Sequence, residues 1–350
     1  MSIPRDDSLL FIVEYFDPAP RLKRQYLLKL FLDGMQVEMV DLKNKKMFLK
    51  KSPCPSHMTP QDFFIGGKVL LYARDLEIID YGDLKTREKL QHQLQPSVVV
   101  LPFELHSVWG KVIDELLGAG LGIVKIKSFV LPENVSGRIC SILRTTDARG
   151  LLSGGNTTLV VMVQGEDGVQ RSLDICSALG CPFVSSSGIE AADLADALLN
   201  TRGLPTSATM DNCTCCIVKP HAIKAKLLGK IMNLISSQGY EISAATTVYF
   251  DRTSAEEFLE VYKGVVPEYP DHVNELAGGM CVALEVRAED AVNTFRQSAG
   301  PWDVEMAKVL RPDSIRGLYG IDRVRNAVHC TDLAQDAVPE VQYCFSIVQQ

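Results

Sequence analysis

The chain lacks the features that mark secreted, membrane-spanning and disordered proteins. Residues 1–7 contain no apolar signal core, and no apolar run approaches the ~18–20 residues that span a bilayer. The ten cysteines are about 3% of the 350 residues, far short of the ~8–10% of a disulfide scaffold. Hydrophobic residues at 46% and charged residues at 23% exclude a disordered or collagen-like chain. These absences predict a soluble, intracellular protein in a reducing compartment, with no membrane contact.

The chain also lacks an excess of positive charge. With 36 Lys and Arg against 43 Asp and Glu, its net charge is −7, so no nucleic acid is predicted as a partner. The stretch from Arg21 to Lys51 is an exception, because it contains nine basic and three acidic residues. One interpretation is that this stretch contacts an acidic partner. The alternative is that its lysines protect an exposed sheet edge from aggregation.

The length predicts two or three domains, since a domain typically has ~100–200 residues. Residues 1–92 contain short apolar runs that alternate with polar residues and turns, which predicts a small antiparallel barrel or sandwich. Asp33-Gly34 predicts a two-residue hairpin turn, because both turn positions favour a positive φ. The stretches Ser185–Gly188 and Thr201–Pro205 resemble linkers and place a domain boundary near residue 205.

Residues 93–208 and 209–350 are predicted to be two copies of one unit. In each copy a short strand pattern ends at a proline, Pro102 or Pro220, and a helical pattern follows. Equivalent positions of the two copies are 118 residues apart before one alignment gap and 119 residues apart after it. In this alignment, Leu101 occupies the position of Lys219. The order strand, helix, strand, helices, strand, helix, strand predicts a ferredoxin-like α/β sandwich for the second copy. The expected fold is therefore α+β and multidomain: a small β barrel followed by two such sandwiches.

Residues that could transfer phosphoryl groups concentrate in the last segment. His329 carries an imidazole, and Arg, Lys and Asn residues are available on neighbouring elements. Transfer of a phosphoryl group through a covalent histidine requires this combination. From spacing alone, a core or surface histidine remains the alternative.

The segment resembles the nucleoside diphosphate kinase family. The family's order and spacing are followed by Lys219-Pro220, Tyr262, Arg296, Arg316, Asn326-x-x-His329-x-Thr331-Asp332 and Glu340. Cys330 and Thr331 stand for the Gly and Ser of the family signature. Residues 48–50 and 79–83 resemble the doublet-microtubule module of ciliary proteins. This second resemblance implies that the first segment is a pleckstrin-homology-like barrel.

The resemblance implies a role for each matched residue. His329 is expected to be the phosphorylated nucleophile, with Glu340 on its other ring nitrogen and Thr331 hydrogen-bonded beside it. The phosphate-binding residues implied by the family are Lys219, Arg296 and Arg316, with Tyr262 next to them. Asn326, together with Lys219, is implied to meet the ribose hydroxyls. Mg²⁺ is expected as a cofactor that arrives with the nucleotide and is held through its phosphates, without a metal site on the protein.

The chain departs from the family pattern around the nucleotide. Cys330 adds a side chain next to the nucleophile, Arg323 replaces an apolar residue against the base, and Trp302 stands near an expected Thr. Tyr269 or Pro270 falls where the family has a stacking Phe. These departures put nucleotide affinity in question.

The middle copy contains no Asn-x-x-His pattern and is predicted to be catalytically inactive. Its His106 is expected to be structural. Cys213, Cys215 and Cys216 lack a second ligand pair at zinc spacing, so they are expected to be buried residues on opposite faces of a strand.

Two functional hypotheses follow from the resemblances. The first is a structural protein of ciliary or flagellar axonemal doublet microtubules, of the microtubule inner protein type. Its partners are then tubulin, other axonemal microtubule proteins and the γ-tubulin ring complex, and its location is the axoneme, cytoskeleton and cytoplasm, with the centrosome or basal body in addition. The alternative is an active nucleoside diphosphate kinase that uses nucleoside di- and triphosphates. The structural hypothesis ranks first, because an inactive copy kept as a folded unit indicates that its surface is used.

Overall fold

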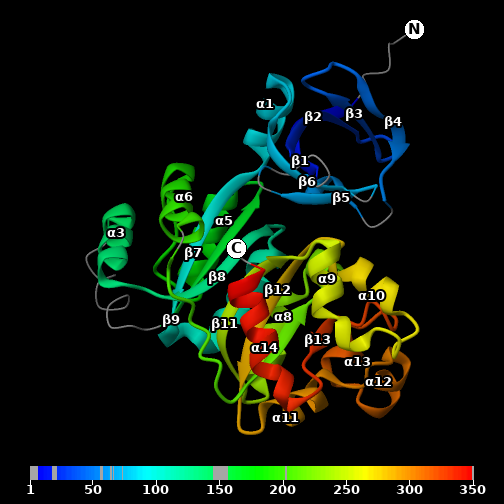
Figure 1. Ribbon diagram of the computed structural model, residues 1–350. Helices are drawn as coiled ribbons and strands as arrows, with labels where there is room; N and C mark the ends of the chain where they lie inside the picture. The colour runs from blue at the N-terminus through cyan, green and yellow to red at the C-terminus, as the bar shows by residue number, and fades with distance from the viewer. Residues whose placement is uncertain are drawn as a thin grey trace. The chain divides into compact units, whose positions relative to one another are not determined.

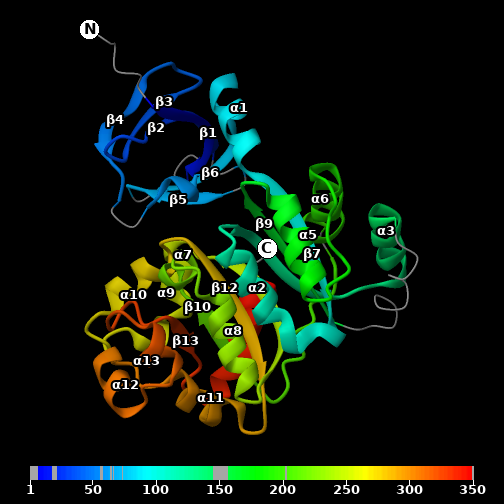
Figure 2. The same cartoon turned by 180° about the vertical axis from the view of Figure 1, so that it is seen from behind.

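The computed structural model describes residues 7–17, 22–55, 58–63, 65, 67–72, 74–144, 157–201 and 203–348. The chain divides into two compact units, Met1–Gln93 and Leu94–Gln350 (Figures 1 and 2). Within the described part of the chain, no helix has both the length and the apolar character needed to cross a membrane.

The first unit is a six-stranded antiparallel sheet with one helix. The sheet order is β4-β3-β2-β1-β6-β5, and the strands curl into a half-barrel (Figure 1). Its elements are β1 (Ser8–Asp17), β2 (Leu22–Phe31), β3 (Gln36–Asp41), β4 (Met47–Pro53), β5 (Lys68–Leu71), β6 (Arg74–Tyr81) and α1 (Leu84–Gln93). Alternating side chains such as Phe11, Val13 and Leu28 are fully buried, as the period of two in a strand requires.

Two details of the first unit differ from the sequence predictions. The predicted small antiparallel barrel is present as a half-barrel in the described residues, because the edge strands β4 and β5 are not paired with each other. The Tyr72 hydroxyl nevertheless donates across this gap to the Pro53 carbonyl at 2.6 Å. The β2–β3 loop has four residues instead of two, since Phe31 pairs with Gln36. The left-handed positions are therefore Gly34 and Met35, not Asp33 and Gly34.

The second unit contains one seven-stranded antiparallel sheet that both predicted copies share, in the order β13-β10-β12-β11-β8-β9-β7. The earlier copy supplies β7 (Gln95–Pro102), α2 (Trp109–Gly118), β8 (Gly122–Val130), α3 (Glu133–Leu143), β9 (Thr157–Gly165), α5 (Gly168–Ala178) and α6 (Gly188–Leu194). The later copy supplies β10 (Cys213–Val218), α7 (Pro220–Lys224), α8 (Leu228–Ser237), β11 (Glu241–Tyr249), α9 (Arg252–Phe258), α10 (Tyr269–Leu276), β12 (Met280–Arg287), α11 (Ala291–Ala299), α12 (Val304–Leu310), α13 (Ile315–Tyr319), β13 (Val328–Cys330) and α14 (Ala337–Gln342).

The later copy has the strand order of a ferredoxin-like sandwich, with its fourth and third strands on either side of its first. Helices α2, α5, α8 and α11 bury apolar side chains against one face of the shared sheet. On the other face, α9, α10 and α14 cover the later copy, and α3 and α6 cover the earlier one. Cys215 lies in the core of one face and Cys216 in that of the other, which confirms their predicted alternation along β10.

The two copies meet symmetrically. Strand β8 pairs with β11, and helix α2 packs on α8. A Cβ added at Gly110 would lie 2.6 Å from the backbone nitrogen of Asn233, and one added at Gly229 would collide with Asp114. Gly229 lies 119 positions after Gly110, and Asn233 lies 119 positions after Asp114. The contacts across the helix crossing are therefore related by a local twofold axis. The sequence repeat thus has a structural counterpart, in which glycine permits close backbone approach.

A hydrogen-bond register identifies the equivalent positions of the copies. In the later copy, the Cys215 N–H donates to Thr331 Oγ1 at 3.0 Å. In the earlier copy, the Val98 N–H donates to Ser185 Oγ, also at 3.0 Å. Two residues farther along each strand, the pairing is also equivalent. Ile217 is paired with His329 in the later copy, and the Val100 N–H donates to the Phe183 carbonyl in the earlier copy.

Two equivalences follow from this register. Phe183, a fully buried aromatic residue, stands in the place of His329. Counting four residues on from Val98 and from Cys215 places Pro102 where the later copy has Lys219. The prediction that Leu101 occupies this place is wrong by one position. Leu101 packs with the α2–α8 face of the sheet, as Val218 does.

Candidate functional site

Strand β13 positions His329 at the edge of the sheet. His329 pairs with Ile217 of β10, and its side chain is only 2% exposed. Its ring meets the edge of Phe258 from α9, with ring centroids 5.1 Å apart. The imidazole is therefore buried between β13 and the helix α9.

Glu340 of α14 fixes the orientation of this imidazole. Its Oε2 atom lies 2.9 Å from His329 Nε2 and accepts a hydrogen bond from Thr331 Oγ1 at 2.8 Å. A carboxylate can only accept, so the His329 ring carries its proton on Nε2. The other nitrogen, Nδ1, is buried and has no hydrogen-bond partner among the described residues. It presents an unused lone pair, as a nucleophile must.

Asp332 joins two further residues of the predicted set. The Tyr262 hydroxyl donates to Asp332 Oδ2 at 2.6 Å, and Arg296 Nε lies 3.2 Å from Oδ1. Burial, together with this hydrogen bond, raises the pKa of Tyr262. Tyr262 lies edge-on to His329 at 6.3 Å between centroids. A hydroxyl and a guanidinium are thus held next to the nucleophile through one carboxylate.

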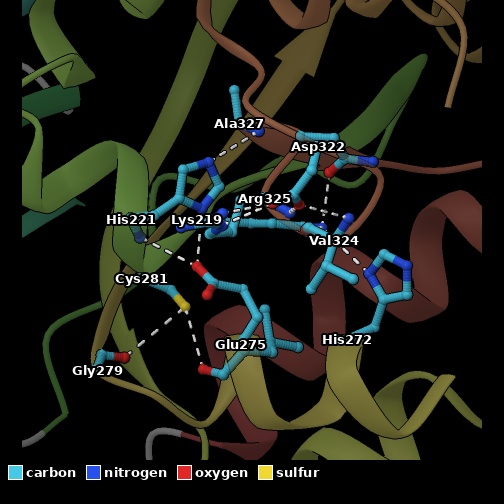
Figure 3. Close-up of polar contacts among 12 residues, drawn as sticks. Lys219, His221, His272, Glu275, Gly279, Cys281, Asp322, Val324, Arg325 and Ala327 are labelled. Carbon is cyan, nitrogen blue, oxygen red and sulfur yellow. Dashed lines mark hydrogen bonds and ion pairs between the residues drawn. The ribbon is translucent and has the colours of Figure 1, made fainter. Parts of the chain in front are cut away.

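Lys219 and Asn326 form a buried pair at the end of β10. The Lys219 ammonium donates to Asn326 Oδ1 at 2.7 Å. It also donates to the Val324 carbonyl at 2.9 Å (Figure 3). The same Lys219 nitrogen lies 3.5 Å from His272 Nδ1 of α10, which is a long hydrogen bond. Burial, with repulsion from Arg316, lowers the pKa of Lys219 to about 7. The charge of this lysine is therefore available at neutral pH and sensitive to it.

A second histidine supports the loop that carries Asn326. His221 Nδ1 lies 2.7 Å from Glu275 Oε1, and His221 Nε2 accepts the Ala327 N–H at 3.1 Å (Figure 3). Because Nε2 accepts, the neutral ring donates from Nδ1 to Glu275. Burial opposes ionisation of Glu275, but hydrogen bonds from His221 hold its pKa below the usual value. Ala327 is held at φ 69°, where strand β13 begins.

Arg316 of α13 is buried beside Trp302. Its guanidinium donates to the carbonyls of Gly300 at 2.8 Å and Val328 at 3.1 Å. It lies 5.4 Å from the centre of the Trp302 ring, and the Lys219 ammonium lies 5.7 Å from the same ring. Cys330 Sγ is 3.6 Å from Arg316 Nη2, and burial raises the pKa of this thiol. The residue next to the nucleophile is thus a neutral thiol that contacts a phosphate-binding candidate.

The residues at the expected base site are engaged elsewhere. Arg323 donates to Asp303 Oδ2 at 2.6 Å and lies 3.4 Å from Glu268. The Tyr269 hydroxyl donates to the Glu256 carbonyl at 3.3 Å. An ion-pair cluster therefore surrounds Arg323, where an apolar residue was expected in contact with a base.

The structure brings all eight predicted site residues into one region on β10, β13 and the elements that flank them. Sequence reasoning did not single out His221, His272, Glu275 or the bridging role of Asp332. His221 directly follows the Lys219-Pro220 motif, and Asp332 is the last residue of the Asn326–Asp332 motif, so both had a usable signal. His272 and Glu275 come from α10, and no local pattern marks them. A cavity of about 500 Å³ lies elsewhere, lined by Gln238, Tyr240, Thr294, Gln297, Ser298 and residues 310–314, none of which belongs to the site.

Comparisons with known proteins agree with the motif. The nucleoside diphosphate kinase family profile matches residues 212–349. Nucleoside diphosphate kinase homolog 7 of Mus musculus is 34% identical over 98% of this chain and 94% of its own length. The homolog 7 of Rattus norvegicus is 35% identical with the same coverage. A crystal structure of the Aquifex aeolicus nucleoside diphosphate kinase shares 34% identity over 39% of this chain and 96% of that chain, with a TM-score of 0.37.

Proposed function

The chain belongs to the nucleoside diphosphate kinase family, as a member of its homolog 7 group, and we propose that it takes a phosphoryl group from a nucleoside triphosphate onto His329 Nδ1. The observation that supports this most directly is the unpaired, buried Nδ1 atom opposite an Nε2 atom held by Glu340. A histidine kept only for packing has no need of a carboxylate that fixes its tautomer. The arrangement is that of an aimed nucleophile.

The proposed transfer has two balanced halves. The Nδ1 lone pair forms a bond to the γ-phosphorus while the bond from that phosphorus to the β–γ bridging oxygen breaks, and the diphosphate leaves with the bonding electrons. The imidazolium that results keeps its proton on Nε2, where the Glu340 carboxylate stabilises it. An acceptor diphosphate then attacks the phosphohistidine and restores the neutral ring. The cations Lys219, Arg296 and Arg316 stabilise the charge spread over the transferred oxygens.

Mg²⁺ fits this scheme as part of the substrate. Among the described residues, no three His, Cys, Asp or Glu side chains gather as a metal site, while the buried groups Lys219 and Arg316 suit anionic oxygens. The ion bound to the nucleotide supplies further charge neutralisation at the phosphates.

The test uses the full chain, because both copies share one sheet. Wild type and His329→Ala are incubated with Mg²⁺ and ATP labelled at the γ-position, and the protein is examined for acid-labile, base-stable label. Label on wild type alone supports the proposal. An unlabelled wild type, or equal labelling of the variant, contradicts it. Release of the label from wild type when GDP is added then measures the transfer from phosphohistidine to the acceptor diphosphate.

A second function is favoured by the earlier copy and by the first unit. We propose that the protein docks on axonemal doublet microtubules through tubulin and associated proteins, including the γ-tubulin ring complex, in cilia, flagella and the basal body. The earlier copy keeps its fold although Phe183 replaces the nucleophile. In the first unit, the edge strand β4 is exposed and carries Lys50 and Lys51.

This docking is tested by co-sedimentation of the full chain with microtubules at rising salt. Attraction between exposed charges is screened over ~8–10 Å near physiological ionic strength, so binding is expected to weaken as salt rises. Lys45 and Lys46 lie in the loop just before β4 and are exposed, as Lys50 is. Replacing these three lysines by Glu should abolish binding, while His329→Ala should leave it unchanged. Binding that ignores both salt and the lysines contradicts the proposed surface.

A further inference from the structure

Three unpaired buried polar atoms gather in the candidate site. Over the described residues, buried side-chain nitrogen and oxygen atoms without a partner are Ser172 Oγ, Thr214 Oγ1, His272 Nε2, Trp302 Nε1 and His329 Nδ1. Native proteins leave few such atoms unpaired, because each has lost its water without compensation. The last three belong to neighbouring rings, so their concentration calls for one explanation.

These rings form a continuous row. The centroid of His272 lies 4.9 Å from that of Trp302, Trp302 lies 5.4 Å from Tyr262, and Tyr262 lies 6.3 Å from His329. The two buried cations, Lys219 and Arg316, both lie within 6 Å of the Trp302 ring centre. The unpaired atoms of His272 and Trp302 therefore occur beside two buried basic side chains.

The chemistry of each unpaired atom follows from its ring. The Trp302 indole nitrogen is always a donor. His272 Nδ1 faces the Lys219 ammonium, which only donates, and burial with repulsion from Lys219 lowers the pKa of His272 to about 4. The neutral His272 ring thus carries its hydrogen on Nε2 and is a second free donor. His329 Nδ1 is the only one of the three with a free lone pair.

Trp302 is held in this position by its backbone. Its carbonyl accepts the Asn326 side-chain amide at 3.3 Å. The following residue, Asp303, caps α12 and pairs with Arg323. Gly300, two residues earlier, adopts φ 85° and lends its carbonyl to Arg316. The backbone is thus held on both sides of Trp302, and the indole N–H is buried without a partner among the described residues.

We infer that Trp302 and His272 bind the ligand: their N–H groups donate to the non-transferred phosphate oxygens of a nucleoside di- or triphosphate, between Lys219 and Arg316. Two free donors and two cations suit anionic oxygens, and the free lone pair suits the phosphorus to be transferred. This rests on the proposed function for the class of ligand. Trp302 thus takes the place of the Thr expected from the family pattern and donates its indole N–H to phosphate.

The chain provides its own optical probe for the test. It has two tryptophans, and Trp109 lies in the earlier copy with its Nε1 bonded to the Pro102 carbonyl. In full-length Trp109→Phe, the emission of Trp302 should change and saturate when Mg-ADP is added. An unchanged emission with calorimetrically observed ADP binding would overturn the contact.

Donor deletion tests the hydrogen bonds themselves. Trp302→Phe keeps an aromatic ring without the N–H, and His272→Leu removes the second donor. Each is expected to weaken Mg-ADP binding at least tenfold by calorimetry, whereas Trp302→Thr, which restores a small donor, should stay within about threefold of wild type. Thermal unfolding verifies that each variant is folded. If the tryptophan variants do not fold, the affinity of His272→Leu alone decides the test.

The outcomes separate this inference from the proposed function. Unchanged ADP affinity in both donor deletions overturns the inference, even if His329 is labelled. Tighter binding by Trp302→Phe overturns it too, because the indole then excludes the ligand. Loss of ADP affinity in a protein whose His329 takes no label retains the inference and contradicts the transfer.

Discussion

Glu340 Oε2 lies 2.9 Å from His329 Nε2 and leaves His329 Nδ1 without a partner in the described structure. The same oxygen accepts the Thr331 hydroxyl at 2.8 Å, and Thr331 in turn accepts the Cys215 N–H. The carboxylate is thus fixed to the sheet at the same point as the nucleophile. The Glu340 carboxylate fixes the proton of the neutral ring on Nε2, and it can stabilise the positive charge of the imidazolium.

Glu340→Gln is expected to slow labelling of His329 by about 100-fold. An amide of the same shape still contacts Nε2 but supplies no charge to stabilise the imidazolium. Losing one preorganised electrostatic contact to developing charge costs ~10²–10³-fold. Single-turnover labelling with Mg-ATP measures the rate. Thr331→Ala is the matched control, because it removes one neighbour of the carboxylate and keeps the charge. Equal rates for wild type and Glu340→Gln would show that the carboxylate has no such role.

Phe183→His is expected not to give the earlier copy a labelled site. Its equivalent of Lys219 is Pro102, which carries no charge to bind phosphate. The test is made in a His329→Ala background, so that any label must come from the earlier copy. Acid-labile label in the double variant would contradict the inactivity of this copy.

The sequence predicted most of the later copy, because its helices and strands have clear periods and its motif spans both ends of β13. It did not predict the register of the earlier copy. In the run Val98–Pro102 every residue is apolar, so a slip of one position leaves the pattern almost unchanged. The tertiary bonds from Val98 to Ser185 and from Cys215 to Thr331 decide it, together with the strand pairing beside them.

The site was predicted where its residues adjoin one another in sequence, as in Asn326–Asp332. His272 and Trp302 escaped an assigned role because tertiary folding alone brings α10 and the α11–α12 loop to Lys219. Likewise, the ion pairs of Arg323 depend on Glu268 and Asp303, which lie 55 and 20 positions away. No local pattern reports such contacts.

Gly229→Ala is expected to destabilise the second unit by about 1–3 kcal/mol, the usual cost of overpacking. Its new methyl group meets the Asp114 backbone of the opposing helix. Gly118→Ala is the matched control: it lies in α2 with no heavy atom within 4 Å of the new Cβ. That change should be neutral or stabilising, because alanine favours helix. Urea unfolding of the full chain measures both. Equal effects of the two changes would contradict the close helix crossing.

Nucleotide binding is expected to weaken as the pH rises above about 7. In the free protein, burial and Arg316 lower the pKa of Lys219 to about 7, so the ammonium loses its proton through this range. Phosphate oxygens favour the charged form, so binding raises this pKa and takes up a proton. Above pH 7 that proton must come from solvent, and the affinity for Mg-ADP should fall by up to about tenfold per pH unit. Below the free-protein pKa the lysine is already charged, and the dependence should level off.

Calorimetry at pH 6.5, 7.5 and 8.5, in buffers of different ionisation enthalpy, measures both the affinity and the proton uptake. Lys219→Met is the control, because it should bind weakly at every pH and lose the proton uptake. A Lys219→Arg variant tests the sign, since guanidinium stays charged throughout this range. If its affinity falls with pH as steeply as that of wild type, some group other than Lys219 carries the dependence. A wild type whose affinity is constant from pH 6.5 to 8.5 would show that Lys219 remains charged despite its burial.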